Sequence, residues 1–349
     1  MAAAPTAHAR PDVVEDTLTR IVTQAGLPGA VAVVRDGDAV TRHVAGYSDV
    51  ETKAGFAANT HVRAASISKT FVAATVLQLI AEGRVDLDAP IERYLPGCVR
   101  GAGIDANAIS VRQLLRHQSG LPEYFDADTP IPIEPKAADE LLAMALPKPA
   151  QFAPGSEIRY TNTNYIVAGL LIEAVTAAPA ADEVTRRIIE PLGLADTYYP
   201  GQGDTGLRSP FAHGYELQDG NRTDVTDFNA SAAGMSGSLI STNEDTSAFL
   251  SALLGGRVLP PVELEQMMDT VPHPENGPGF RYGLGLASID LPCGVTVWGH
   301  GGDIEGYHSL MVKPIDDAAI SMTVTQDSAS ESVDDDPRAA VVDAFYCGG

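Results

Sequence analysis

The chain has 349 residues, of which 44% are hydrophobic, so it can bury a large core as two domains or as one domain with an inserted lobe. Its 46 acidic residues outnumber 23 basic ones and give a formal net charge of -23, which makes nucleic acid and anionic membrane surfaces poor partners. The three cysteines are too few for a disulfide framework and lack the close spacing of zinc ligands, so no metal site is expected.

The N-terminus, MAAAPTAHARPDVVED, has neither the basic start nor the apolar stretch of a secretory signal. No later segment is long and apolar enough to span a bilayer. The sequence therefore predicts a soluble chain, which is cytoplasmic if it is complete as written and secreted if a signal peptide was removed.

The pattern of apolar residues predicts strands near both ends and helices between them. Two β-favouring runs, 30–34 and 39–45, flank Asp36-Gly37-Asp38 and predict a hairpin. Apolar residues at helical spacing then predict a buried helix over 69–82 that stops at Gly83. Further helices are predicted at 111–116, 137–146, 165–176 and 338–346, and further strands at 295–298 and 319–325.

Strands at both ends around a helical middle predict an α/β (α+β) fold. We expect residues 1–76 and 230–349 to form one α/β domain built from both termini. Residues 77–229 would form a mostly helical inserted domain.

The motif Ser66-Ile67-Ser68-Lys69 lies at the start of the predicted buried helix. Residues three apart on a helix share a face, so the Lys69 amine can reach the Ser66 hydroxyl. A lysine desolvated by the core can lose its proton and serve as the base for a serine nucleophile. The pattern S-x-x-K is short, however, and it also fits a capping serine followed by an exposed lysine.

Two further motifs follow in order along the chain. Tyr160-Thr161-Asn162 precedes a helical run, and His300-Gly301-Gly302 follows the strand that ends at Trp298. Together with S-x-x-K they resemble the Y-x-N and H-x-G version of the signature of serine β-lactamases and DD-peptidases, the penicillin-binding proteins. The sequence is similar to actinomycete D-alanyl-D-alanine carboxypeptidases, and also to class C β-lactamases, D-aminopeptidases and related esterases. Four segments extend this resemblance over nearly the whole chain: 79–96, 111–121, 154–169 and 282–286.

The resemblance implies an antiparallel sheet flanked by helices and a role for each motif residue. Ser66 would attack the substrate carbonyl, and Lys69 would assist its deprotonation. Tyr160 would relay a proton to the leaving group, and Asn162 would orient the substrate amide and Lys69. His300 would donate a hydrogen bond or help to hold Tyr160.

The strand after His300 is expected to meet the substrate. Gly299, Gly301 and Gly302 fit a strand edge that a substrate backbone approaches closely, although they would also fit a bend. By analogy with the family, the backbone N–H of Asp303 would join that of Ser66 in an oxyanion hole.

The departures from the family concern the leaving group. Carboxypeptidase members hold the substrate carboxylate with an arginine after a G-L-G-L segment, and this position is Ala287 here. A hydroxyl position on the H-x-G strand is Asp303, which would repel a carboxylate. Arg281 is a candidate replacement. We therefore expect the leaving group or acceptor to be an amine, an alcohol or a methyl ester, with Asp303 as a candidate partner for a positive charge.

Three functions stay open at this point. The first is a D-alanyl-D-alanine carboxypeptidase-like hydrolase that β-lactams would inhibit covalently. The second is a transacylase or esterase of natural-product biosynthesis, which would pass the acyl group of a small-molecule or peptide donor to an amine acceptor. The third is a non-catalytic penicillin-binding sensor, which the intact motifs disfavour. None of them needs a cofactor or a metal.

The resemblance also implies a disulfide. Cys293 and Cys347 fall where the actinomycete carboxypeptidases have one, and Cys98 would stay free. Two buried thiols would fit a cytoplasmic protein equally well.

Overall fold

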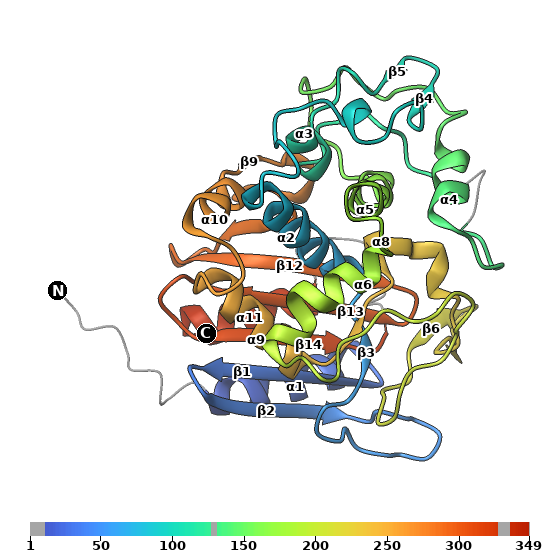
Figure 1. Ribbon diagram of the computed structural model, residues 1–349. Helices are drawn as coiled ribbons and strands as arrows, with labels where there is room; N and C mark the ends of the chain where they lie inside the picture. Colours follow the sequence, from blue (N-terminus) through green and yellow to red (C-terminus); the bar gives the residue numbers. More distant parts are fainter. Residues whose placement is uncertain (1–10, 127–130, 327–335, 349) are drawn as a thin grey trace.

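The computed structural model describes residues 11–126, 131–326 and 336–348. An eight-stranded antiparallel sheet crosses the molecule in the order β2-β1-β14-β13-β12-β11-β10-β9 (Figure 1). Its strands are β1 (Gly29–Asp36), β2 (Ala39–Gly46), β9 (Val271–Pro272), β10 (Phe280–Tyr282), β11 (Ala287–Asp290), β12 (Thr296–Ile304), β13 (Tyr307–Lys313) and β14 (Ala319–Val324). The predicted α/β fold with an antiparallel sheet is confirmed.

Both parts of the chain that flank the helical middle contribute to this sheet. Strand β1 pairs with β2 on one side and with β14 on the other, where Ala30 lies opposite Val324. Asp36 and Ala39 close the hairpin between β1 and β2, and Gly37 in the turn has a φ of 58°, which glycine adopts without a steric cost. The N-terminal hairpin is therefore present as predicted.

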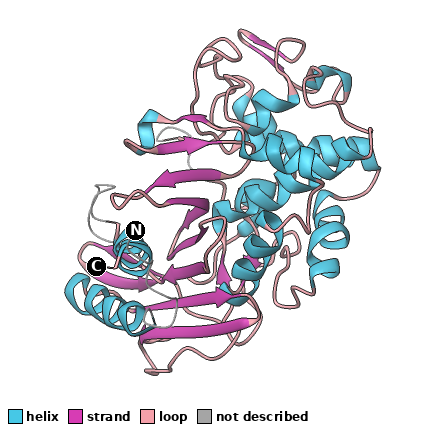
Figure 2. Cartoon of the chain, turned by 90° about the vertical axis from the view of Figure 1, so that its left-hand side faces the viewer, coloured by secondary structure: helices cyan, strands magenta, loops and turns pink. Residues whose placement is uncertain are grey.

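Helices cover both faces of the sheet (Figures 1 and 2). Apolar side chains of the first helix, Val14, Leu18 and Ile21, recur at helical spacing and are buried in the core on one face. Four helices form the two outer layers: α1 (Pro11–Ala25) and α11 (Pro337–Cys347) on this face, and α2 (Ser68–Ala81) and α9 (Asn243–Leu254) on the other.

Apart from α5, which has 14 residues, the remaining helices and strands are short. The helices are α3 (Val111–Leu115), α4 (Ala138–Ala145), α5 (Thr163–Thr176), α6 (Ala180–Val184), α7 (Glu190–Leu192), α8 (Gly234–Gly237) and α10 (Pro261–Met268). The strand pairs are β3 (Val62–Arg63) with β8 (Ile240–Ser241), β4 (Arg100–Gly101) with β5 (Ile104–Asp105), and β6 (Tyr215–Gln218) with β7 (Asn221–Asp224). One apolar core joins α2, α3 and the sheet through Phe71, Leu114 and Met311. The domain boundaries at 77 and 229 stay a prediction.

Predicted helices agree with the structure to within one or two residues, and predicted strands agree less well. The strand predicted at 295–298 continues as β12 to Ile304. The predicted strand ended at Trp298 because Gly299, Gly301 and Gly302 are weak strand formers. In the structure, pairing with β13 holds these glycines in an extended strand. Helix α1 was not predicted, since no helix was expected before the N-terminal hairpin.

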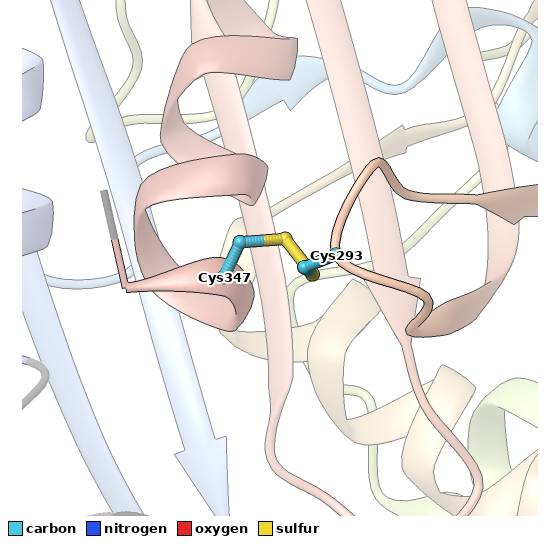
Figure 3. The surroundings of a disulfide bond; sticks show 2 residues. All are labelled: Cys293 and Cys347. Atoms are coloured by element: carbon cyan, nitrogen blue, oxygen red, sulfur yellow. A yellow bond between two sulfur atoms is a disulfide. The ribbon is translucent and has the colours of Figure 1, made fainter.

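A disulfide joins Cys293, in the loop between β11 and β12, to Cys347, the last residue of α11 (Figure 3). The end of α11 is thereby tied to the sheet. Cys98 is a free, exposed thiol.

Among the described residues, no single helix is long and apolar enough to cross a membrane. One pair of helices, Thr163–Thr176 and Ala180–Leu192, meets the criterion together by length and composition, with a bend of 80° between them.

Candidate active site

Ser66 lies in a tight turn that leads into α2. The 3-10 helix η2 (Ala65–Ile67) precedes α2 directly, and Ala65 has a φ of 48°, which an L-residue adopts only at a cost. Ser68, the next serine, points inward, where its hydroxyl donates to the Ala65 carbonyl at 2.6 Å. The side chain of Ser66 stays partly exposed while its neighbours are buried. The strained turn thus presents one hydroxyl to solvent at the start of a buried helix.

Lys69 is fully buried and contacts three oxygen atoms. Its Nζ lies 2.9 Å from Ser66 Oγ, 2.7 Å from Asn162 Oδ1 and 2.8 Å from the carbonyl oxygen of Ser236. The side-chain oxygen of Asn162 and the carbonyl oxygen of Ser236 can only accept hydrogen bonds, so each accepts one from an N–H group of Lys69. The third contact is with a hydroxyl, which can donate its own proton to a neutral amine.

The surroundings of Lys69 favour the neutral amine. Burial lowers the pKa of Lys69 from its ordinary value to about 7, and the charge of Glu123 partly opposes this effect. Glu123 accepts from the side-chain amide of Asn162 at 3.1 Å and from its backbone N–H at 2.7 Å. Glu123 thereby fixes the orientation of Asn162, which directs its oxygen toward Lys69.

Tyr160 lies over the same amine. Lys69 Nζ is 4.8 Å from the centroid of the Tyr160 ring, and the ring of His117 stacks on Tyr160 with the two centroids 4.3 Å apart. Burial raises the pKa of Tyr160 well above its ordinary value, and a hydrogen bond with Ser66 only partly opposes this. Tyr160 therefore stays a protonated phenol that can donate.

His300, expected to donate a hydrogen bond or to help hold Tyr160, contacts the hydroxyl of Tyr282. Its Nε2 lies 2.8 Å from the hydroxyl of Tyr282, whereas the rings of His300 and Tyr160 are 6.3 Å apart. The Nδ1 atom contacts the carbonyl of Gly301 and carries the proton, so Nε2 accepts from Tyr282. Burial and the nearby Lys69 lower the pKa of His300 to about 4. His300 is thus a neutral ring, held by Tyr282.

Strand β12 has an open edge next to Ser66. Pairing with β11 ends at Gly299, while pairing with β13 continues to Ile304. A side chain at Gly302 would overlap the carbonyl of Ala64, because β12 passes directly against the turn that holds Ser66. Gly302 is therefore required by the protein's own backbone, whereas Gly301 faces more open space, with no heavy atom nearer than 3.8 Å to the position of a Cβ.

Asp303 is not free to meet a positive charge on a ligand. Its Oδ1 lies 2.8 Å from Arg338 Nη1 and 2.9 Å from His308 Nδ1. Burial alone would raise the pKa of Asp303, but the hydrogen bond from His308 and the charge of Arg338 outweigh it and lower the pKa. Arg281 does not fill the vacant arginine position either, since its guanidinium bonds to Thr270 at 2.9 Å. A guanidinium that does contact β12, that of Arg338, comes from α11.

A cavity of about 880 Å³ unites these residues. Its wall includes most of the predicted site, namely Ser66, Tyr160, Asn162, His300, Gly301 and Asp303. Arg338 also lines it, and Lys69 lies behind Ser66. No group of His, Cys, Asp or Glu side chains among the described residues is arranged to hold a metal ion.

Five residues of the site were missed in the sequence: His117, Glu123, Ser236, Tyr282 and Arg338. His117 and Tyr282 lie in two segments that resemble the family, 111–121 and 282–286, and Glu123 comes two residues after the first. These positions could have been flagged from the sequence. Nothing in their local patterns marks Ser236, which acts through a backbone carbonyl, or Arg338, which reaches β12 from the last helix.

The sequence matches the model of one known protein family. The family model described as Beta-lactamase matches residues 14–344. The chain therefore belongs to the β-lactamase family, as the three motifs predicted. The finer likeness to actinomycete carboxypeptidases stays a prediction.

Solved structures similar to the chain include two amide-cleaving enzymes. A D-stereospecific amidohydrolase from Streptomyces sp. is 37% identical with a TM-score of 0.88, over 97% of this chain and 99% of that chain. A D-amino acid amidase from Ochrobactrum anthropi SV3, complexed with L-phenylalanine amide, is 29% identical with a TM-score of 0.84, over 97% and 98%. These names agree with the predicted class, a serine hydrolase or acyltransferase.

Similar curated proteins are longer than this chain. Penicillin-binding protein 4* of Bacillus subtilis (strain 168) is 26% identical over 305 residues, which are 82% of this chain and 65% of that protein. Protein flp of Staphylococcus aureus (strain COL) is 28% identical over 206 residues, 58% of this chain. The match spans 41% of the length of that relative.

Proposed function

We propose that the protein cleaves amides or esters of D-configured amino acids through an acyl-enzyme on Ser66, and that its leaving group carries no carboxylate. The observation that carries this proposal is the contact of Ser66 Oγ with Lys69 Nζ, an amine whose pKa burial lowers to about 7. A serine next to a neutral amine has a base for its proton.

The proposed reaction uses the two proton carriers in turn. Ser66 Oγ bonds to the carbonyl carbon as its proton moves to Lys69, and the N–H groups of Ser66 and Asp303 would stabilise the oxyanion. When the bond to the leaving group breaks, Tyr160 gives its proton to the leaving nitrogen or oxygen and regains one from Lys69. Water, or an added amine, then attacks the ester to Ser66 and releases the acyl group by the same steps in reverse.

The substrate class follows from the relatives and from the leaving-group side of the site. Two of the similar solved structures are named as a D-stereospecific amidohydrolase and a D-amino acid amidase. Ala287 provides no cation for a terminal carboxylate, and Arg281 is bonded to Thr270. These observations favour an amide or ester leaving group over the terminal D-alanine of a carboxypeptidase substrate. β-Lactams remain candidate covalent inhibitors, and an amine remains a candidate acyl acceptor.

Mass spectrometry of the intact protein tests the proposal. The substrates are D-phenylalanine amide, D-phenylalanine methyl ester and a D-alanyl-D-alanine peptide as its free acid and its C-terminal amide, each with and without an added amine. We expect acylation at Ser66 and turnover of the amides and ester, with the free acid processed at least tenfold more slowly.

Two variants separate the possible outcomes. Ser66→Ala should abolish acylation, whereas Ser156→Ala, a change at an exposed serine, should leave it intact. A strong preference for the free acid would support a carboxypeptidase instead. Acylation without turnover would support a sensor, and an amide product formed with the added amine would support a transacylase.

A further inference from the structure

The cavity at Ser66 extends beyond the catalytic cluster into the space between the sheet and α11. Apolar side chains from four elements and one loop line this part: Phe280, Ala287, Ile289, Leu291, Leu310 and Val342. Several of them belong to the core that α1 and α11 form with the sheet. The catalytic residues therefore share one cavity with a chamber that has these apolar side chains in its wall, and the charged residues Glu275, Asp290, Asp336, Arg338 and Asp343 line the same cavity.

Small residues separate the two parts of the cavity. Ala287 lies opposite Gly299 where β11 and β12 pair, and Gly301 follows on the open edge of β12. A Cβ at Gly301 would still have 3.8 Å to its nearest neighbour, Ser309 O, and 3.9 Å to Leu310. Ser66, Ile289 and Leu310 line one cavity, so the small residues Ala287 and Gly301 mark the path that a chain of methylene groups on the substrate would take between them.

The charged groups of the chamber disfavour an anion. Arg338 Nη1 donates to Asp303 and to the carbonyl of Ser309, at 2.8 and 2.9 Å. Its Nε and Nη2 donate to Asp336, at 3.0 and 2.9 Å. A guanidinium has five N–H groups, so one is left, too few for a bidentate grip on a carboxylate. Two carboxylates around one cation also leave a net negative charge.

We propose that this chamber is a leaving-group subsite for an apolar, uncharged substituent on the scissile nitrogen, such as an alkyl or aryl amine. The inference rests on the proposed function, because it needs an amide that Ser66 attacks. Tyr160, the proposed proton donor to the leaving nitrogen, lines the same cavity. A substituent on that nitrogen would therefore enter the cavity that contains the chamber.

Matched amides of D-phenylalanine test the subsite. We compare kcat/KM for the primary amide, the N-butyl amide, the N-hexyl amide and the amide of aminohexanoate, which has a carboxylate at the end of a similar chain. Each buried methylene adds a few-fold, so kcat/KM should rise from the N-butyl to the N-hexyl amide. The aminohexanoate chain has as many methylenes as the N-hexyl chain but must bring a carboxylate out of water, so the N-hexyl amide should exceed the carboxylated amide by about tenfold or more. Equal rates for these two would overturn the inference.

Variants at the passage provide the control. Ala287→Phe should lower the ratio of N-hexyl to primary amide cleavage by about tenfold, because the ring fills the passage. Val262→Phe, the same enlargement at an exposed position on α10, should not change the ratio. Ala287→Arg is a second test, since a free guanidinium should raise kcat/KM for the carboxylated amide. An unchanged ratio in Ala287→Phe together with no gain in Ala287→Arg would overturn the subsite.

The outcomes distinguish the two proposals. If the primary amide is cleaved through Ser66 but kcat/KM for the N-hexyl amide is no higher, the proposed subsite is wrong and the proposed function stands. If no amide or ester acylates Ser66, the proposed function fails, and the subsite fails with it.

Discussion

Lys69 and Arg338 are two basic side chains withdrawn from solvent near one cavity, and the sheet separates the helices that carry them. Lys69, on α2, contacts a hydroxyl, an amide oxygen and a carbonyl oxygen. Arg338, on α11, is held by Asp303 and Asp336. Burial lowers the pKa of Lys69 to about 7, whereas burial of Arg338 is outweighed by its two carboxylates, which raise its pKa.

The two basic side chains differ in the direction of their pKa shifts because of their direct partners, more than because of their burial. Neutral oxygens satisfy the N–H groups of an amine without compensating its charge, so the amine can lose its proton. Carboxylates compensate the charge and keep it. We infer that the α2 side is arranged for proton transfer, while the α11 side fixes a strand and a helix in place.

The largest effect is expected where Lys69 is made to resemble Arg338. Lys69→Arg replaces an amine that can be neutral by a guanidinium that stays charged, so the proposed base is lost. We expect the rate of Ser66 acylation to fall by about 10²–10⁴-fold, as followed by mass spectrometry of the intact protein. Lys53→Arg, a change at an exposed lysine, serves as the control. An acylation rate within threefold of the parent would mean that Lys69 is not the base.

A smaller effect, on stability, is expected on the α11 side. Arg338→Met leaves Asp303 and Asp336 without their cation. Asp303 keeps 56% of its side chain exposed, so we expect the free energy of unfolding in urea to fall by about 2 kcal/mol, less than for a fully buried pair. Arg100→Met, at an arginine that is 67% exposed beside Glu92, should cost no more than about 0.5 kcal/mol. Equal costs for the two variants would contradict a structural role for Arg338.

The smallest effect concerns the pH dependence of acylation. Because the proposed reaction needs a neutral Lys69, the acylation rate should rise with pH through an apparent pKa near 7 and level off above it. The charge of Glu123 raises the pKa of Lys69, so Glu123→Gln should move the rise to lower pH. Glu157→Gln, at an exposed carboxylate, should leave the profile in place. A shift to higher pH in Glu123→Gln would contradict this arrangement.

The motif residues could be predicted from sequence because they are spaced by regular local structure. Ser66 and Lys69 share one face of a helical segment, and their side chains are in contact. Asn162 directly precedes α5, and the resemblance to the family predicted its contact with Lys69. The contacts between distant segments could not be predicted. Arg338 reaches Asp303 only because α11 packs against the sheet, and no local pattern encodes that distance.

The hydrogen-bond partner of His300 could not be predicted from the sequence either. The motif indicated a histidine at the site, but its hydrogen-bond partner depends on β10, which brings Tyr282 to 2.8 Å from Nε2. Short strands such as β10 have too few residues for a recognisable alternation of apolar and polar positions. The fold class was therefore easier to predict than the second layer of contacts around the motif residues.

The pairing of β1 with β14 sets the order in which the nascent chain can fold. Residues 30 and 324 are neighbours in the sheet, so at about 5–20 residues per second the N-terminal hairpin waits roughly 15 to 60 s on the ribosome for its partner strand. The helices around α2 and α5 have most of their partners much earlier. The unpaired edge of β1, rich in alanine and valine, is meanwhile open to wrong strands, and a chain that terminates before β14 keeps it open.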